Sequence, residues 1–204
     1  LNTLVNNNEN VAIGNDSLAS LSNGTGNTAV GHKALEDNTA EHNTAVGHNA
    51  LLQNSTGNQN TAMGSSAGAN ISTGQYNTYI GRRAGYANGS GSSNTAVGRS
   101  SMEDATSAAE QNTCMGQVAG FNLQSDNNTF LGYSAGSTVT TGADNVAVGS
   151  QTMDTATTGT GNIAIGKAAF SAGNGSYLTA IGVSALNSCT GSHNIAIGRN
   201  TGAA

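Results

Sequence analysis

Aromatic and arginine side chains gather in the middle of the chain, between residues 79 and 133. Five of them are Tyr79, Arg82, Arg83, Phe130 and Tyr133. Exposed aromatic rings can stack on sugars, and guanidinium groups pair with carboxylate or phosphate. These five residues are therefore the candidates for a surface that binds a ligand. The structural alternative is that the rings at 79 and 130 fill a widened interface.

All six lysines and arginines lie one or two positions after a glycine that recurs along the chain. They are Lys33, Arg82, Arg83, Arg99, Lys167 and Arg199. Such a stripe could meet acidic glycans or lipopolysaccharide. It could equally be a solvent-facing turn column paired with acids such as Glu36, Asp37, Glu103, Asp104 and Asp154. We favour the second interpretation, because the stripe is interrupted and the chain carries a net charge of -5.

Histidine and cysteine spacing argues against a metal site. His32 and His48 occupy equivalent places in adjacent repeats and are expected to stack about 5 Å apart, but no third ligand shares their column. Cys114 and Cys189 are about four repeats, or roughly 19 Å, apart, which exceeds the reach of a disulfide. We therefore predict two free thiols, no bound metal and no cofactor.

No constellation of residues points to catalysis. The glycine pairs lack the strand, helix and lysine that accompany a phosphate-binding loop. The acids fall out of register, whereas a glycan-cleaving enzyme needs two facing carboxylates. The basic residues form no patch suited to nucleic acid, and no apolar run is long enough to cross a membrane. The predictions are no enzyme activity, no catalytic residue, no nucleic-acid partner and no membrane insertion.

A repeat organises the whole chain. The segment Asn27–Gly31 reads N-T-A-V-G, and twelve copies of this motif recur at spacings of 16 to 18 residues. The fuller unit reads N-T-A-V-G-x-x-A-L-x-x-x-x-T-G-x-x. It is too short for two packed helices, and its β-branched residues and regular glycines favour strands and turns. We predict one repeat domain over residues 1–204, with repeats at about 10–202.

The alternation within the motif predicts how each coil is built. Positions two and four hold Thr, Val, Ile, Met or Leu and share one face of a strand, which we expect to line the interior. Position three, nearly always Ala, would then face outward, and the two glycine columns would supply turns with positive φ. The predicted fold is all-β: a parallel β-solenoid, or β-roll, of about twelve coils of 16–18 residues. Each coil would have two short strands and two turns.

Two further expectations follow from stacking such coils. The asparagine that opens each motif would form a ladder, with amides bonded to the coils above and below. Each coil would bury few apolar side chains, so oligomerisation through the outward alanine column is a plausible way to stabilise the thin lateral face.

The motif resembles repeats of known fibrous surface proteins. Asn10–Gly14 reads N-V-A-I-G and is similar to the head repeats of trimeric autotransporter adhesins. The longer unit resembles repeats of phage tail fibres, whose group the 16–18-residue period favours. This resemblance covers essentially residues 10–202. It implies a left-handed parallel β-roll, intertwined or packed as a homotrimer.

The same resemblance implies a function and a place. The chain would be an extracellular segment of a longer fibre, on a virion tail or a bacterial cell surface. It would support or mediate binding to a host surface, with a cell-surface glycan or receptor as the possible partner.

Two other functions stay open. An ice-binding β-solenoid is suggested by the threonine rank at 28, 44, 61, 78, 95, 113 and 129, because a flat outward array spaced by about 4.8 Å can match ice. Against ice binding, later repeats hold Val146, Ile163 and Ile195 at the same position, and such exchange of threonine with apolar residues is expected of a buried column. The second is the subunit of a self-assembling extracellular filament.

Overall fold

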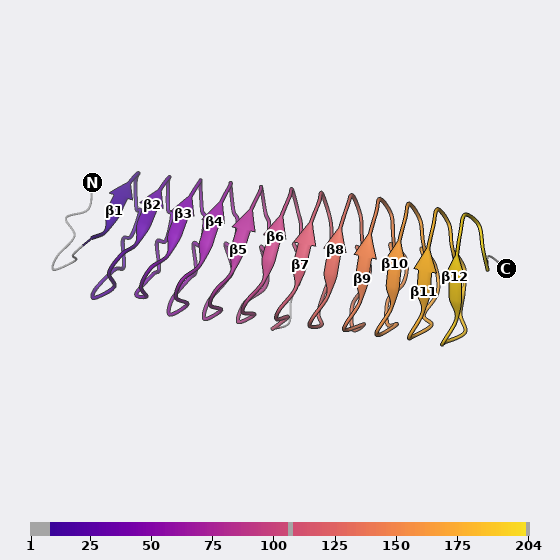
Figure 1. The fold of residues 1–204 in the computed structure, drawn as a ribbon. Helices are drawn as coiled ribbons and strands as arrows, with labels where there is room; N and C mark the ends of the chain where they lie inside the picture. The colour runs from indigo at the N-terminus through magenta and orange to yellow at the C-terminus, as the bar shows by residue number, and fades with distance from the viewer. Residues whose placement is uncertain (1–8, 106–107, 203–204) are drawn as a thin grey trace.

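The chain winds in coil after coil along one axis, and each coil contributes one short strand (Figure 1). The computed structural model describes residues 9–105 and 108–202. Within them, twelve parallel strands of three residues each form a single sheet in chain order. The strands are β1 (Val11–Ile13), β2 (Thr28–Val30), β3 (Thr44–Val46), β4 (Thr61–Met63), β5 (Thr78–Ile80), β6 (Thr95–Val97), β7 (Thr113–Met115), β8 (Thr129–Leu131), β9 (Val146–Val148), β10 (Ile163–Ile165), β11 (Thr179–Ile181) and β12 (Ile195–Ile197).

This architecture confirms the predicted all-β parallel β-solenoid. The outer ends of the predicted domain, residues 1–8 and 203–204, lie outside the described residues. Neighbouring strands pair in register throughout, so that Thr28 pairs with Thr44 and Val30 with Val46. The spacing of the motifs varies, but the register does not. The turns therefore absorb the extra residues, and equivalent side chains stack in ranks along the rod.

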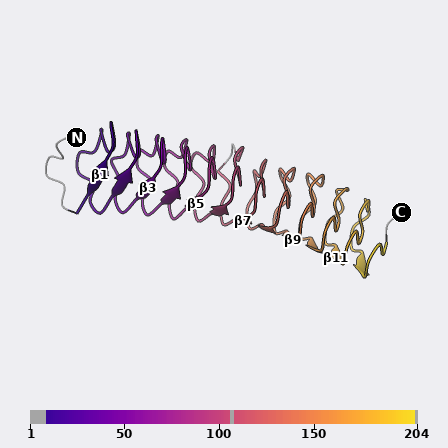
Figure 2. The ribbon, with the colours of Figure 1, turned by 90° about the horizontal axis from the view of Figure 1, so that it is seen from above.

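The wall opposite the sheet is not a second strand, so the prediction of two strands per coil is wrong. Lys33 and Leu35 have φ values of 56° and 52°, in the left-handed region that an extended strand excludes. Backbone hydrogen bonds still join neighbouring coils along this wall. The Leu35 N–H, for example, donates to the Ala50 carbonyl at 3.0 Å. The wall therefore follows a sequence of tight turns that stack as regularly as the strands do (Figure 2).

The interior lies on the alanine side of each strand, which reverses the predicted orientation. Ala29 is fully buried, whereas Thr28 and Val30 are partly exposed. Leu35, from the opposite wall, is fully buried as well. The coil is so narrow that one wall supplies a small side chain where the other supplies a large one. Alternation shows that positions two and four share a face, but it does not show which face is inside.

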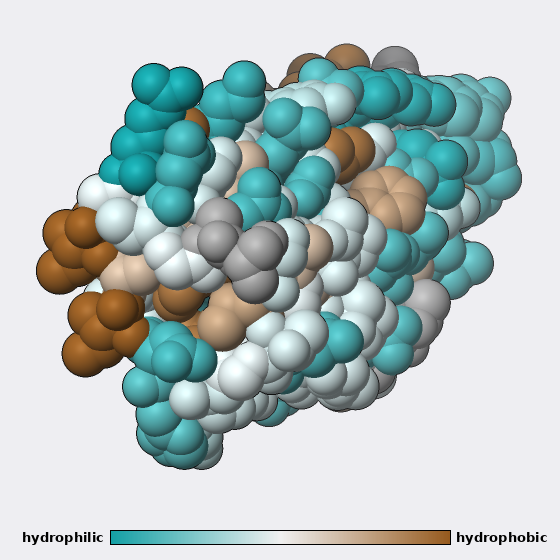
Figure 3. All heavy atoms as spheres, turned by 90° about the vertical axis from the view of Figure 1, so that its right-hand side faces the viewer, coloured by the Kyte–Doolittle hydropathy of each residue, from teal (hydrophilic) through white to brown (hydrophobic). Residues whose placement is uncertain are grey.

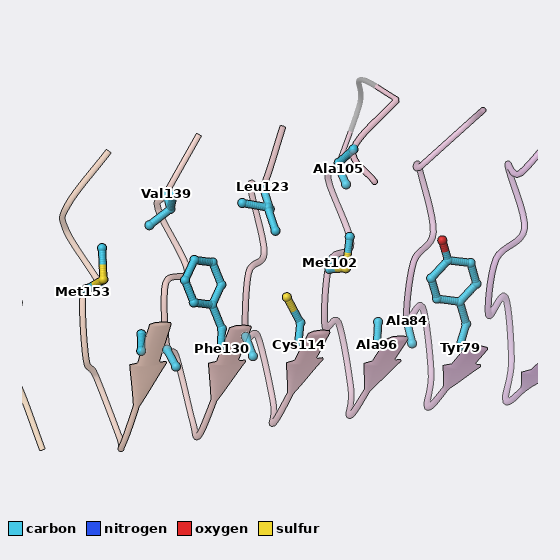
Figure 4. Packing of buried hydrophobic residues seen from close by; sticks show 14 of the residues in the cluster. Tyr79, Ala84, Ala96, Met102, Ala105, Cys114, Leu123, Phe130, Val139 and Met153 are labelled. Carbon is cyan, nitrogen blue, oxygen red and sulfur yellow. The ribbon is translucent and has the colours of Figure 1, made fainter. Parts of the chain in front are cut away.

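Figure 4 shows how the two walls meet in the middle of the rod. Cys114 and Phe130 point inward from β7 and β8, and Leu123 and Val139 belong to the opposite wall. All four side chains are buried. The core is thus a thin seam that runs the length of the solenoid.

Both glycine columns lie where neighbouring coils approach closely, but only the motif column also needs a positive φ. The motif glycines have φ between 124° (Gly198) and 141° (Gly116), as a turn with positive φ requires. Gly57, in the second column, does not have a left-handed backbone. A Cβ there would lie 2.2 Å from the Gly74 carbonyl oxygen of the next coil. The predicted turn role of the second column is therefore wrong, and close approach between coils explains its glycines.

The predicted asparagine ladder is confirmed. The side-chain oxygen of Asn77 accepts the backbone N–H of Asn94 at 2.9 Å. Its amide nitrogen donates to the Gly91 carbonyl at 2.9 Å. The ladder satisfies polar backbone groups that would otherwise be buried without partners. Leu178 replaces one asparagine of the ladder. Its backbone N–H still donates to the Asn162 side chain at 2.9 Å, but its apolar side chain offers no acceptor to the next coil.

Candidate interaction face

The side chains of positions two and four stand on the outer side of the sheet, and we call this surface the sheet face. Its first rank consists of Val11, Thr28, Thr44, Thr61, Thr78, Thr95, Thr113, Thr129, Val146, Ile163, Thr179 and Ile195. Its second rank consists of Ile13, Val30, Val46, Met63, Ile80, Val97, Met115, Leu131, Val148, Ile165, Ile181 and Ile197. No charged residue belongs to either rank.

Large apolar side chains are exposed along the whole sheet face. Ile13 near one end is 57% exposed, and Met63 and Met115 in the middle are 47% and 44% exposed. Figure 3, which looks from the C-terminal end, shows hydrophobic side chains projecting at the left of the view, whereas much of the remaining surface is hydrophilic. Exposed apolar side chains bordered by polar groups are typical of an interaction surface.

Charges of opposite sign border this face. The basic rim follows the strands by two residues and consists of Arg82, Arg99, Lys167 and Arg199. The acidic rim lies within two residues before the motif asparagine and consists of Glu9, Glu41, Glu110, Asp126 and Asp144. All nine side chains are exposed, and none makes a salt bridge within residues 9–105 and 108–202.

Two basic residues point away from the rim and pair within the chain. Lys33 lies 2.9 Å from Glu36, and this hydrogen bond raises the pKa of the lysine. The Arg83 Nε atom lies 2.9 Å from Glu103 Oε1, and the guanidinium lies 4.3 Å from the Tyr86 ring centre. The predicted pairing of basic residues with acids therefore holds for these two.

Tyr79 and Phe130 are not surface residues, so their expected exposure is wrong. Both are fully buried, because position three faces the interior. The Tyr79 hydroxyl accepts a hydrogen bond from the Asn88 side chain at 3.2 Å, and burial raises the pKa of the phenol. Neither ring can stack on a ligand, and neither can fill an interface with another chain.

The other three candidate residues separate into two groups. Arg82 and Tyr133 are exposed and share one rank, three coils apart. Arg83 is partly covered by its contacts with Glu103 and Tyr86. The neighbours of Arg82 in that rank are Ser65 and Arg99, one coil away on either side, and neither is an aromatic residue. The five candidates therefore do not form a single site.

The histidines and cysteines lie close to where spacing placed them. The rings of His32 and His48 stack with centres 5.2 Å apart. Cys114 and Cys189 are free thiols, and burial raises the pKa of Cys114. No cluster of three or more metal-ligating side chains occurs in the part of the chain that the structure describes. Residues 9–105 and 108–202 also enclose no pocket.

The sheet face itself was missed by the sequence reasoning, although a signal for it exists. Position three is small in most repeats but holds a large ring in two of them, at Tyr79 and Phe130. Where it holds a ring, glycine occurs at the leucine position of the same repeat, at Gly85 and Gly136. Such compensation in volume is typical of a packed interior, and it identifies positions two and four as the outer face.

The fold and this face together define a β-solenoid with one apolar, charge-bordered side. Comparison with models of protein families, with curated proteins and with solved structures finds no match for the chain. Among the described residues, no helix has the length and apolar character needed to cross a membrane.

Proposed function

We propose that the chain is a structural segment of an extracellular fibre, of the phage tail-fibre or bacterial surface-adhesin kind, and that it assembles as a homotrimer through the sheet face. The observation that carries this proposal is the uncharged sheet face of all twelve strands, whose second rank is wholly apolar and whose side chains are partly or fully exposed. Burial of such a surface against other copies would remove it from water.

The build of the chain supports this assembly. The interior of each coil is a thin seam in which one wall supplies mainly alanine. A second apolar layer between chains would widen the hydrophobic core without lengthening the repeat. The rod shape and the resemblance of the N-T-A-V-G unit to fibre repeats fit a segment that holds a binding tip away from its anchor, outside the cell.

The partner of the fibre would be a cell-surface glycan or receptor. Direct contact by this segment would use Arg82 and Tyr133, which are exposed on the single chain and would lie along the border of the assembled sheet faces. Attachment through a separate tip would use neither residue. Binding of the purified protein to an array of acidic glycans, with Arg82→Ala and Tyr133→Ala as variants, separates the two modes.

The absolute mass in solution tests the assembly. Light scattering should give about three times the chain mass of 20.1 kDa. A monomer that keeps a β-type circular dichroism spectrum would contradict the proposal. Very long species would instead favour a self-assembling filament subunit.

One observation favours ice binding as a second candidate. The threonine rank of β2 to β8 lies on the outer side of the sheet, so the objection that it is a buried column no longer applies. Seven threonines in register, spaced by about 4.8 Å, form a regular hydroxyl and methyl array. Thermal hysteresis in a monomeric preparation would support this function, and its absence would remove it.

A further inference from the structure

Basic and acidic side chains lie at opposite ends of the strands. The four residues of the basic rim all follow a strand, and the five of the acidic rim all precede one. His32 and His48 extend the basic rim, and His42 and His193 lie in the acidic rim. The sheet face therefore has one positive and one negative long edge.

We propose that copies of the chain associate in parallel, with the basic rim of each copy against the acidic rim of the next. This inference rests on the proposed function, because it assumes that the sheet faces meet. The partner is a second copy of this chain, and the recognition element is the pair of opposite rims.

Geometry links the two rims to the direction of packing. If copies are related by rotation about an axis parallel to the rod, the strands run round that axis in one sense. The strand ends of one copy then face the strand beginnings of the next, so the basic rim faces the acidic rim. Arg99 after β6 then lies one coil from the level of Glu110 before β7, and Lys167 after β10 lies one coil from the level of Asp144 before β9. In an antiparallel face-to-face pair, the strands of both copies run the same way, and each rim meets its own kind. Opposite charges favour the first arrangement, and like charges penalise the second.

The middle of the rod carries the densest charges on both rims. Arg82 and Arg99 follow β5 and β6, while Glu110 and Asp126 precede β7 and β8. All four are exposed. Asp126 also accepts the Glu110 N–H at 2.8 Å, which fixes its carboxylate at the edge. None of these carboxylates or guanidinium groups is neutralised by a salt bridge within the described chain.

Variants that remove charge from one rim show whether the contact between rims is attractive or repulsive. Arg82→Gln with Arg99→Gln should weaken association, raising the apparent dissociation constant by roughly tenfold at low salt, with a smaller change at high salt. In an antiparallel assembly, the same variant would relieve repulsion and strengthen association. No change, or stronger association, would overturn the proposal.

Charge reversal supplies the matched test. Arg82→Glu with Arg99→Glu, and Glu110→Arg with Asp144→Arg, should each weaken association more than neutralisation does. The fourfold variant exchanges the two rims and should restore much of the affinity. If the fourfold variant does not recover affinity, the two rims do not contact each other, because the effects of the two double variants would then be independent.

A distance measurement reads the direction itself. Spin labels at Asn23→Cys, in a Cys189→Ser background, mark the N-terminal coil. Parallel packing keeps labels of neighbouring copies at the same level, whereas antiparallel packing separates them by about 50 Å along the rod. A long distance would contradict parallel packing and, with it, a three-fold assembly, whereas rim variants that leave the association of a trimer unchanged would overturn this inference alone. A monomeric wild-type protein would contradict the proposed function as well, so the two failures are distinguishable.

Discussion

The Tyr79 ring occupies the space that a side chain at Gly85 would need. A Cβ at Gly85 would lie 2.3 Å from the Tyr79 Cδ1 atom. Phe130 and Gly136 repeat the relationship at 2.5 Å. A large residue on the sheet wall is thus matched by glycine on the opposite wall, which reverses the usual alanine and leucine pairing. Figure 4 shows the Tyr79 and Phe130 rings projecting from the sheet wall into the interior.

Gly85→Ala should destabilise the protein because the new methyl group would overlap the Tyr79 ring and because the backbone φ at Gly85 is 60°. We expect a loss of about 2–4 kcal/mol in the free energy of unfolding, measured by chemical denaturation. Gly89→Ala is the control, since a Cβ at Gly89 meets no atom within 4 Å. Equal losses for the two variants would contradict the packing relationship.

Tyr79→Ala should leave a cavity and cost about 3–5 kcal/mol. Adding Gly85→Leu restores the small-and-large pairing found elsewhere and should recover part of that loss. A double-mutant cycle measures the coupling between the two sites. Strictly additive effects would show that the two walls do not share this space.

Asn77→Ala removes the acceptor for the Asn94 N–H and the donor to the Gly91 carbonyl. Because these groups are buried, we expect a loss of about 2–4 kcal/mol. Gln75→Ala, in the preceding loop, is the matched control and should change stability little. Thermal unfolding followed by circular dichroism compares the two variants, and a neutral Asn77→Ala would be incompatible with a structural ladder.

The protein should lose stability in alkali. Burial raises the pKa of Cys114 above its ordinary value of 9.0, so the folded state retains a proton that the unfolded state releases. The stabilisation is complete below pH 9 and declines above it by about 1.4 kcal/mol per pH unit for this group. Tyr79 adds a similar loss above its ordinary value of 10.0.

Cys114→Ala places the usual residue of this column at the site and should reduce the alkaline loss that begins near pH 9. Denaturant titrations at several pH values measure it. In the native wild-type protein, a thiol reagent should modify the partly exposed Cys189 and spare the buried Cys114. Rapid modification of both thiols would contradict the buried position.

Much of the fold was predictable because repetition amplifies weak local signals. Twelve in-phase motifs predicted the parallel solenoid, its register, the asparagine ladder and the His32–His48 stack. The inside and outside of the strand were not predictable from alternation, since Thr28 and Val30 suit an interior as well as an outer sheet face. The second wall resisted prediction because non-glycine residues such as Lys33 and Leu35 adopt a left-handed backbone there.

The prediction of the candidate site was partly wrong for the same reason. Tyr79 and Phe130 were assigned to the surface because position three was assigned outward. Arg82 and Tyr133 lie in turns, whose exposure does not depend on that assignment, and they are exposed as expected.

The most direct test compares the mass in solution of two double variants. Met63→Lys with Met115→Lys puts two charges on the sheet face, while Ser20→Lys with Gln53→Lys puts the same charges on exposed positions of the opposite wall. Light scattering should give a folded monomer for the first variant and the wild-type mass, about three times 20.1 kDa, for the second. If the sheet-face variant keeps that mass, the sheet face does not hold the copies together.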